Sequence, residues 1–111
     1  MTVSELLKLE LFKVINEEGD TEKTITGPYC CDLLSIAMSK SPAGAAWVTV
    51  MGNINTLAVA SLTEAAVVIL AEGIVLDEAV AAKAKEQGII VLATDQPIYE
   101  TARRMEELIR A

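Results

Sequence analysis

The stretch AAVVILAEGIVLDEAVAAKAKEQGIIVLATD, residues 65–95, decides the fold that the sequence predicts. It contains two short apolar runs, 65–70 and 89–93, without the polar alternation of a strand that has one face in water. Between them, Asp77 can cap a helix, and Gly88 suits the position just beyond its end. Strands that are apolar on both faces, separated by a helix, predict a parallel sheet covered by helices.

The flanking sequence extends this pattern. The order of the expected elements becomes regular from residue 46, and from 46 to 110 strand and helix alternate. The chain of 111 residues, 1–111, is therefore expected to form one domain of the α/β class, a three-layer α/β/α fold with a mainly parallel sheet. The predicted elements are a helix over 2–9, strands over 11–16 and 24–26, a helix over 29–40, a strand over 46–51, a helix over 54–62, the two apolar strands with their helix, and a last helix from about 97 to 110, on which Glu100 and Arg104 form an exposed pair.

Charge and hydropathy argue against two classes of partner. The formal net charge is −7, and the nine basic residues are scattered without a stripe, so nucleic-acid binding is not expected. Charged residues interrupt the N-terminal segment, which is unlike a signal peptide. The charge-free stretch 41–63 contains Pro42 and Gly44 and is too broken to span a membrane. A soluble, cytoplasmic protein is the expectation.

Histidine is absent from the chain, which removes the common Ser-His-Asp and Cys-His arrangements. A zinc site would have only two cysteines and carboxylates, an atypical set. No G-x-x-x-x-G-K-[ST] loop is present either, so phosphoryl transfer on a P-loop is not expected. These observations favour a protein without cofactor or metal that is not an enzyme. A small-molecule transferase using Asp32 or Asp95 as base ranks last.

The loops that follow the predicted strands meet at one edge of the sheet, where ligands bind in open α/β folds. Those loops are 52–55, 72–76 and 94–96. The candidate ligand-binding residues are Gly52, Asn53 and Asn55 in the first loop, Gly73 in the second, Thr94, Asp95 and Gln96 in the third, and Asp32 and Ser35 on the second helix.

Each of these groups also has a purely structural interpretation. Asn53 can hold an anion, or it can cap the following helix while Asn55 is solvated. Asp95 can accept a ribose hydroxyl, or the polar residues 94–96 can satisfy free N–H groups where the last helix begins. Asp32, Ser35 and Ser39 form a polar stripe that either lines a pocket or dimer contact, or favours the helix dipole and faces water.

Cys30 and Cys31 are adjacent at the predicted start of the second helix. A disulfide between neighbours would be strained, since their Cα atoms lie only about 3.8 Å apart. A helix N-terminus could lower a thiol pKa and make one of them reactive, and a dimer could gather four thiols around a metal. Small packing residues are the favoured interpretation.

Four segments together resemble a known family: GPYCCDLLSIAM (27–38), WVTVMGNINTLAVASL (47–62), VVILAEG (67–73) and GIIVLATD (88–95). They resemble the small stand-alone proteins of the DRTGG-domain group, which are similar to the N-terminal domain of HPr kinase/phosphorylase. The resemblance covers about residues 2–108. The D-R-T-G-G string itself is missing.

This resemblance implies a three-layer α/β/α domain that is often dimeric. Relatives occur beside CBS domains or in larger enzymes, and some look associated with iron-only hydrogenase gene sets. It supplies no catalytic residues. The expected function is a non-catalytic regulatory module, a homodimer, that binds a small molecule such as a nucleotide or another phosphorylated metabolite. The alternative is a ligand-free accessory protein that docks on a metabolic or redox partner of the hydrogenase type.

Overall fold

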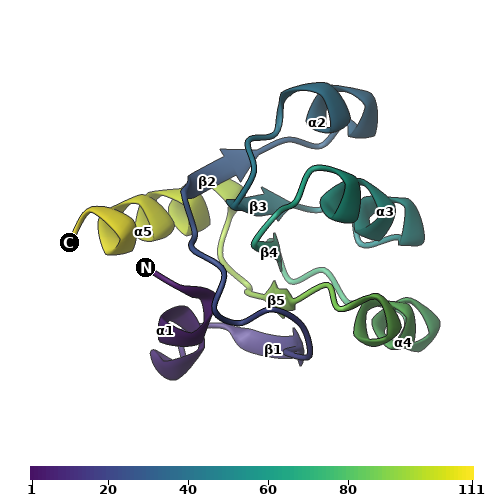
Figure 1. Cartoon of the computed structure of the whole chain (residues 1–111), viewed down its shortest axis with the longest axis horizontal. Coiled ribbons are helices and arrows are strands. Elements are labelled where there is room, and N and C mark those ends of the chain that lie inside the picture. Colours follow the sequence, from purple (N-terminus) through teal and green to yellow (C-terminus); the bar gives the residue numbers. More distant parts are fainter.

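The apolar strands form the centre of a five-stranded sheet in the computed structural model, which describes residues 1–111 (Figure 1). Every residue of the three central strands is buried, as the continuous apolar runs predict. The elements are α1 (Val3–Lys8), β1 (Lys13–Asn16), β2 (Gly27–Cys30), α2 (Leu34–Lys40), β3 (Ala45–Thr49), α3 (Ile54–Leu62), β4 (Val67–Leu70), α4 (Glu78–Gln87), β5 (Val91–Ala93) and α5 (Ile98–Arg110).

The strand order is β1-β5-β4-β3-β2. Strands β2 to β5 run parallel, and only β1 is antiparallel, pairing with β5 at the edge of the sheet. The predicted α/β class and mainly parallel sheet are confirmed.

Helices cover both faces of the sheet (Figure 1). Successive residues of β4 alternate between the two cores: Ile69 packs in the cluster that contains Met105 of α5, and Leu70 packs in the cluster that contains Leu57 of α3. Helix α1 belongs to the first cluster with α5, whereas α2 and α4 share the second with α3. The fold therefore has three layers, with α1 and α5 on one face and α2, α3 and α4 on the other.

This arrangement separates two neighbouring loops. The chain leaves β4 toward α4 on one face, and it leaves β5 toward α5 on the opposite face. Where adjacent parallel strands send their connections to opposite sides, a crevice opens at their carboxyl ends. Strand β1 begins at the same edge, because it runs antiparallel to β5.

The predicted elements around residues 24–40 are wrong in position. Residues 24–26 are not a strand, although Thr24 forms an isolated bridge with Thr2. The edge strand is Gly27–Cys30, paired with β3 from Ala45 to Val48, and α2 begins at Leu34 rather than at residue 29. The apolar spacing of this segment fits a helix, but parallel pairing with β3 prevails, and Pro28 is acceptable because β2 is an edge strand.

The two cysteines consequently do not lie at a helix start. Cys30 ends β2 and is exposed, while the half-buried Cys31 has its thiol 3.3 Å from the carbonyl of Leu33. Partial desolvation, and secondarily the charge of Asp32, raise the pKa of the Cys30 thiol. The helix-terminus effect that would have lowered a thiol pKa is absent here.

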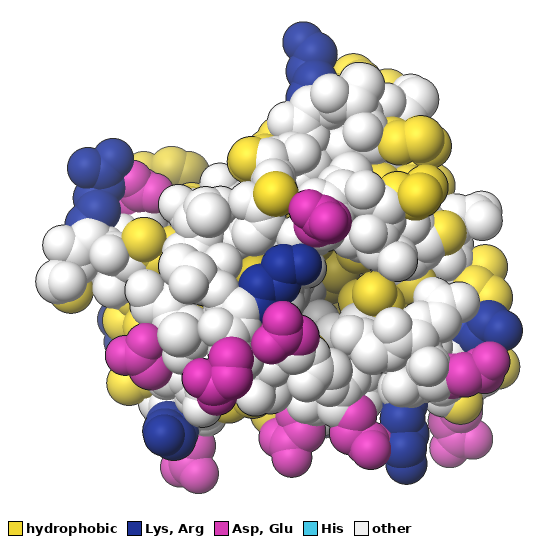
Figure 2. Space-filling model, viewed as in Figure 1, with side chains coloured by type: hydrophobic (Ala, Val, Ile, Leu, Met, Phe, Trp, Pro, Cys, Tyr) yellow, Lys and Arg dark blue, Asp and Glu magenta, His cyan; other side chains and the backbone are white.

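The face of the molecule that Figure 2 shows is divided by charge. Acidic side chains gather over the part of the molecule that contains α1, β1 and α4, whereas the surface over α2 and α3 is mostly hydrophobic or uncharged (Figure 2).

None of the helices combines the length and the apolar character that crossing a bilayer requires.

Candidate ligand site at the carboxyl edge of the sheet

A cavity of about 500 Å³ lies at the crevice between the β4–α4 loop, the β5–α5 loop and the start of β1. Its volume falls in the range of small-molecule sites, roughly 300–1,000 Å³. Its lining combines apolar and polar side chains. The apolar residues include Leu11, Ile15, Ile74, Val75 and Leu76, and the polar ones are Lys13, Thr94, Asp95 and Gln96.

The two loops at this cavity are tied together by their backbones. The N–H of Glu72 donates to the carbonyl of Gln96 at 2.9 Å, and the N–H of Gly73 donates to the carbonyl of Thr94 at 3.0 Å. Gly73 has φ of +71°, a conformation that glycine adopts without strain. A Cβ there would lie 3.3 Å from Oδ1 of Asp95, so glycine also leaves room for that carboxylate.

The polar side chains of the β5–α5 loop are largely unused within the protein. Thr94 Oγ1 accepts the N–H of Gln96 at 3.2 Å, whereas the side chains of Asp95 and Gln96 make no hydrogen bond to the protein. The N-cap of α5 is Pro97, without a side-chain cap. The hydroxyl of Thr94 therefore serves an N–H just before α5. Asp95 and Gln96 satisfy no N–H group at the helix start, so the structural interpretation is wrong for these two residues, and their side chains are available to a ligand.

Lys13 supplies the positive charge of the cavity. It is exposed, forms no ion pair, and pairs through its backbone with Ala93, the last residue of β5. Local sequence does not mark Lys13 as a site residue: the spacing predicts a strand over 11–16, but the position of that strand beside β5 depends on long-range pairing. The exposed Leu11 precedes it on the cavity rim.

The first predicted loop is closed instead of hollow. Asn53 caps α3, because its Oδ1 accepts the N–H groups of Asn55 and Thr56 at 3.0 and 3.1 Å. Gly52 and Asn53 border a space of only about 10 Å³, which is too small for a ligand, and Asn55 is exposed outside both spaces. The capping interpretation of Asn53 is confirmed.

Asp32 also has partners within the chain. Its Oδ1 accepts the hydroxyl of Thr49 at 2.6 Å and the N–H of Val50 at 2.9 Å, which joins the end of β2 to the end of β3. Asp32 precedes α2, so the predicted helical stripe with Ser35 and Ser39 is wrong. Ser35 is exposed on α2, away from the cavity. The structure thus brings together four of the predicted residues, namely Gly73, Thr94, Asp95 and Gln96.

No cluster of three or more His, Cys, Asp or Glu side chains capable of holding a metal ion is present. The polar groups at the cavity are an ammonium group and an amide that donate hydrogen bonds, a carboxylate that accepts them, and a hydroxyl. Such a set can orient an organic ligand with an anionic group and hydroxyls through hydrogen bonds.

Fold and site together define a three-layer α/β domain with a small-molecule-sized cavity at the carboxyl edge of its sheet. The chain belongs to the DRTGG domain family, which it matches over residues 13–108. The resemblance noted in the sequence is thereby confirmed, while the likeness to HPr kinase/phosphorylase stays a prediction. A search of curated proteins finds no match.

A solved structure shares the fold. It is the crystal structure of the CBS and DRTGG domains of the regulatory region of Clostridium perfringens pyrophosphatase, complexed with its activator diadenosine tetraphosphate. The TM-score is 0.72 at 13% sequence identity, and the match covers 94% of this chain and 45% of that chain. This chain therefore corresponds to less than half of its neighbour, and the likeness concerns the fold.

Proposed function

We propose that the protein is a non-catalytic regulatory module that binds a nucleotide or another phosphorylated metabolite in the carboxyl-edge cavity. The observation that carries the proposal is the combination, in one cavity of about 500 Å³, of apolar side chains with the unpaired Lys13 and the unpartnered side chains of Asp95 and Gln96. Family membership supports a regulatory role, because the structural neighbour is a regulatory region that binds a nucleotide activator.

The chemistry of the cavity fits the parts of a nucleotide. Ile15, Ile74 and Leu76 offer a surface for a flat base, since apolar contact is not directional. The carboxylate of Asp95 accepts hydrogen bonds from hydroxyls such as those of ribose. The ammonium group of Lys13 attracts a phosphate. The complementarity is therefore to a ligand that is apolar at one end and anionic at the other.

A thermal-shift screen with nucleotides and phosphorylated metabolites tests the proposal. A true ligand at 100 times its Kd stabilises the protein by about 2.7 kcal/mol. In Lys13→Glu we expect the stabilisation by this ligand to fall by at least half. Lys40→Glu, the same change on an exposed residue of α2, should respond like the wild type. An equal response of all three proteins would refute the site, and flat responses throughout would favour the ligand-free accessory role.

We further propose that the module is a homodimer that associates through the face formed by α2 and α3. This face exposes Leu33, Ile36, Met38, Ile54 and Leu62, while residues 41–63 contain no charge at all. With a net charge of −7, two copies repel each other least where they present uncharged surface. Several exposed apolar side chains on one face are typical of an interface.

Light scattering tests the association. The dimer predicts twice the monomer mass of 11.9 kDa. Ile36→Glu should shift the equilibrium to monomer, whereas Tyr99→Glu, on an exposed position of α5, should leave the dimer intact. A wild-type protein that is monomeric at high concentration would rule out the dimer.

A further inference from the structure

A second hollow of about 260 Å³ adjoins the cavity on the side of α5. The two spaces share Leu11, Thr94 and Gln96, so these residues form a saddle between them. Phe12 packs toward the core under α5, whereas Ile15 packs toward the core under α4. The start of β1 therefore divides one continuous depression into two halves.

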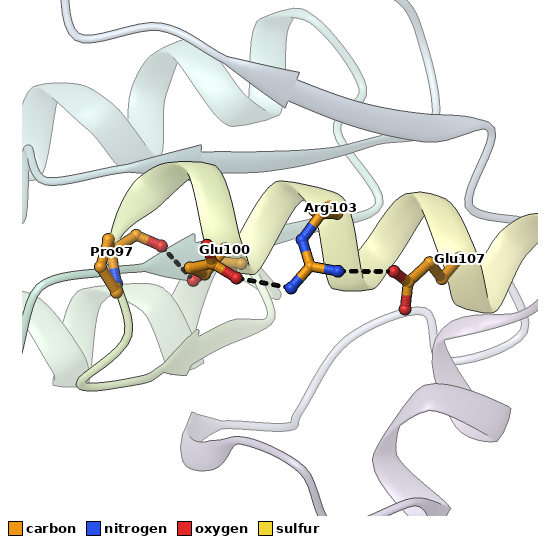
Figure 3. A network of polar contacts seen from close by, with 5 residues as sticks. Pro97, Glu100, Arg103 and Glu107 are labelled. Atoms are coloured by element: carbon orange, nitrogen blue, oxygen red, sulfur yellow. Dashed lines mark hydrogen bonds and ion pairs between the residues drawn. The ribbon is translucent and has the colours of Figure 1, made fainter.

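Two neighbouring arginines of α5 border the second hollow, and they differ in their partners. The guanidinium of Arg103 lies between two carboxylates, 2.6 Å from Glu100 and 2.9 Å from Glu107 (Figure 3). Its hydrogen bond with Glu100 and the nearby carboxylates raise the pKa of Arg103. Arg104 has no carboxylate within 4.0 Å. The predicted pair of Glu100 with Arg104 is thus wrong.

This division leaves Arg104 as the cation in the lining of the second hollow that has no carboxylate partner. Glu100 is the only acidic residue that lines it, and Glu100 is already paired with Arg103. Arg104 is therefore free to pair with an anion from outside. Its planar fork of donors can bind two oxygens of a phosphate or carboxylate at once.

We propose that the second hollow is an anion subsite in which Arg104 binds a second anionic group of the ligand that occupies the main cavity. The inference rests on the proposed ligand-binding function and deepens it: the ligand carries two separated anionic groups and crosses the saddle at Leu11 and Gln96. Lys13 holds one group and Arg104 the other, and the free side-chain amide of Gln96 lies between them.

The ligand class follows from this geometry. A nucleoside monophosphate offers one anionic group, enough for one of the two cations, whereas a chain of two or more phosphates offers a group for each. Affinity should therefore rise from the monophosphate to the triphosphate of one nucleoside, because each additional contact between a phosphate and a cation adds to the binding free energy. The gain should depend on Arg104 alone among the arginines of α5.

An NMR titration of the full chain with inorganic pyrophosphate tests the subsite. In the wild type we expect amide shifts at residues 94–96 and 100–104, with affinity weakened about tenfold in Arg104→Gln, the effect of losing one charged hydrogen-bonding partner. Arg110→Gln, the same change at the far end of α5, should bind within about twofold of the wild type. No shifts in these segments, or equal affinities in the two variants, would overturn the subsite.

A second titration, with a nucleoside monophosphate, separates this inference from the proposed function. It reports on the main cavity through the amides of residues 73–76 and of Lys13. Monophosphate binding without an effect of Arg104→Gln on pyrophosphate would leave the function standing and remove the subsite. Pyrophosphate binding at Arg104 without any monophosphate binding would reduce the second hollow to an isolated anion site, and it would overturn both the proposed function and a ligand that spans the two hollows.

Discussion

The carboxyl edge of the sheet has two halves that are built from similar residues and behave differently. At the ends of β2 and β3, polar side chains find partners inside the chain: Asp32 binds Thr49 and Val50, and Asn53 caps α3. At the ends of β4 and β5, the side chains of Asp95 and Gln96 have no such partners and border a cavity. The first half is closed, and the second half is open.

The difference shows what separates a structural polar residue from a candidate for binding. A polar residue in a loop after a strand is ambiguous, because a helix start and a ligand offer it the same kind of hydrogen bond. On the closed half the neighbouring N–H groups use the side-chain oxygens. On the open half, α5 has Pro97 as its N-cap and no side-chain cap, so the side chains of Asp95 and Gln96 stay free for a ligand.

The largest effect is expected from Trp47, which anchors the closed half. Its side chain is fully buried in the core under α3, and its indole N–H donates to the carbonyl of Cys31 at 3.0 Å. Trp47→Ala should lower the free energy of unfolding by about 3–5 kcal/mol. Urea denaturation measures the loss, with Tyr99→Ala, an exposed aromatic on α5, expected within about 0.5 kcal/mol of wild type. A loss below about 1 kcal/mol for Trp47→Ala would contradict the anchor.

Asp32 gives the next largest effect and separates a structural from a ligand role. Asp32→Ala leaves Thr49 and the N–H of Val50 without their acceptor, which should cost about 1–3 kcal/mol of stability. Asp32→Asn keeps an acceptor oxygen and should cost clearly less. Both variants should bind the ligand of the open half like the wild type. If both instead abolish ligand binding in calorimetry while remaining folded, Asp32 belongs to the site.

The central part of the fold was predictable from local sequence. Continuous apolar runs gave β4 and β5, and Asp77 and Gly88 marked the ends of α4, where the structure has a side-chain cap and a left-handed residue. These signals act over a few residues, so no knowledge of the partner strands is required. The loops gathered at the carboxyl edge followed from the topology of parallel strands.

Long-range choices were not predictable in the same way. The segment around Tyr29 has apolar spacing that suits a helix, yet it pairs with β3 as a strand. Lys13 enters the cavity only because β1 lies antiparallel beside β5. Arg103 and Arg104 lie three and four residues after Glu100, and both spacings permit a pair. The selection of Arg103 is a matter of side-chain geometry that spacing does not encode.

A smaller effect is expected from Asn53. Asn53→Ala removes the cap of α3 and should lower the free energy of unfolding by about 1 kcal/mol. Asn55→Ala, two residues later in the same helix, is the matched control and should change stability by less than about 0.5 kcal/mol. Ligand affinity should remain unchanged in both. A loss of affinity in Asn53→Ala, with the fold intact by circular dichroism, would move the site to the half that is closed here.

The smallest effect is a change in thiol reactivity beside Asp32. Partial desolvation, and secondarily the negative charge of Asp32, raise the pKa of Cys30, so its thiolate forms at higher pH than in the unfolded chain. Since only the thiolate reacts, alkylation by iodoacetamide near pH 8 should be slower in the native protein than in urea. Asp32→Asn should move the rate profile part of the way back to lower pH, because the charge is removed and the desolvation stays. Glu64→Gln, an exposed acid after α3, should leave the profile unchanged. Mass spectrometry after timed quenching distinguishes alkylation of Cys30 from alkylation of Cys31. If Cys30 in the native protein is alkylated at least as fast as in urea, the closed half does not lower the reactivity of this thiol.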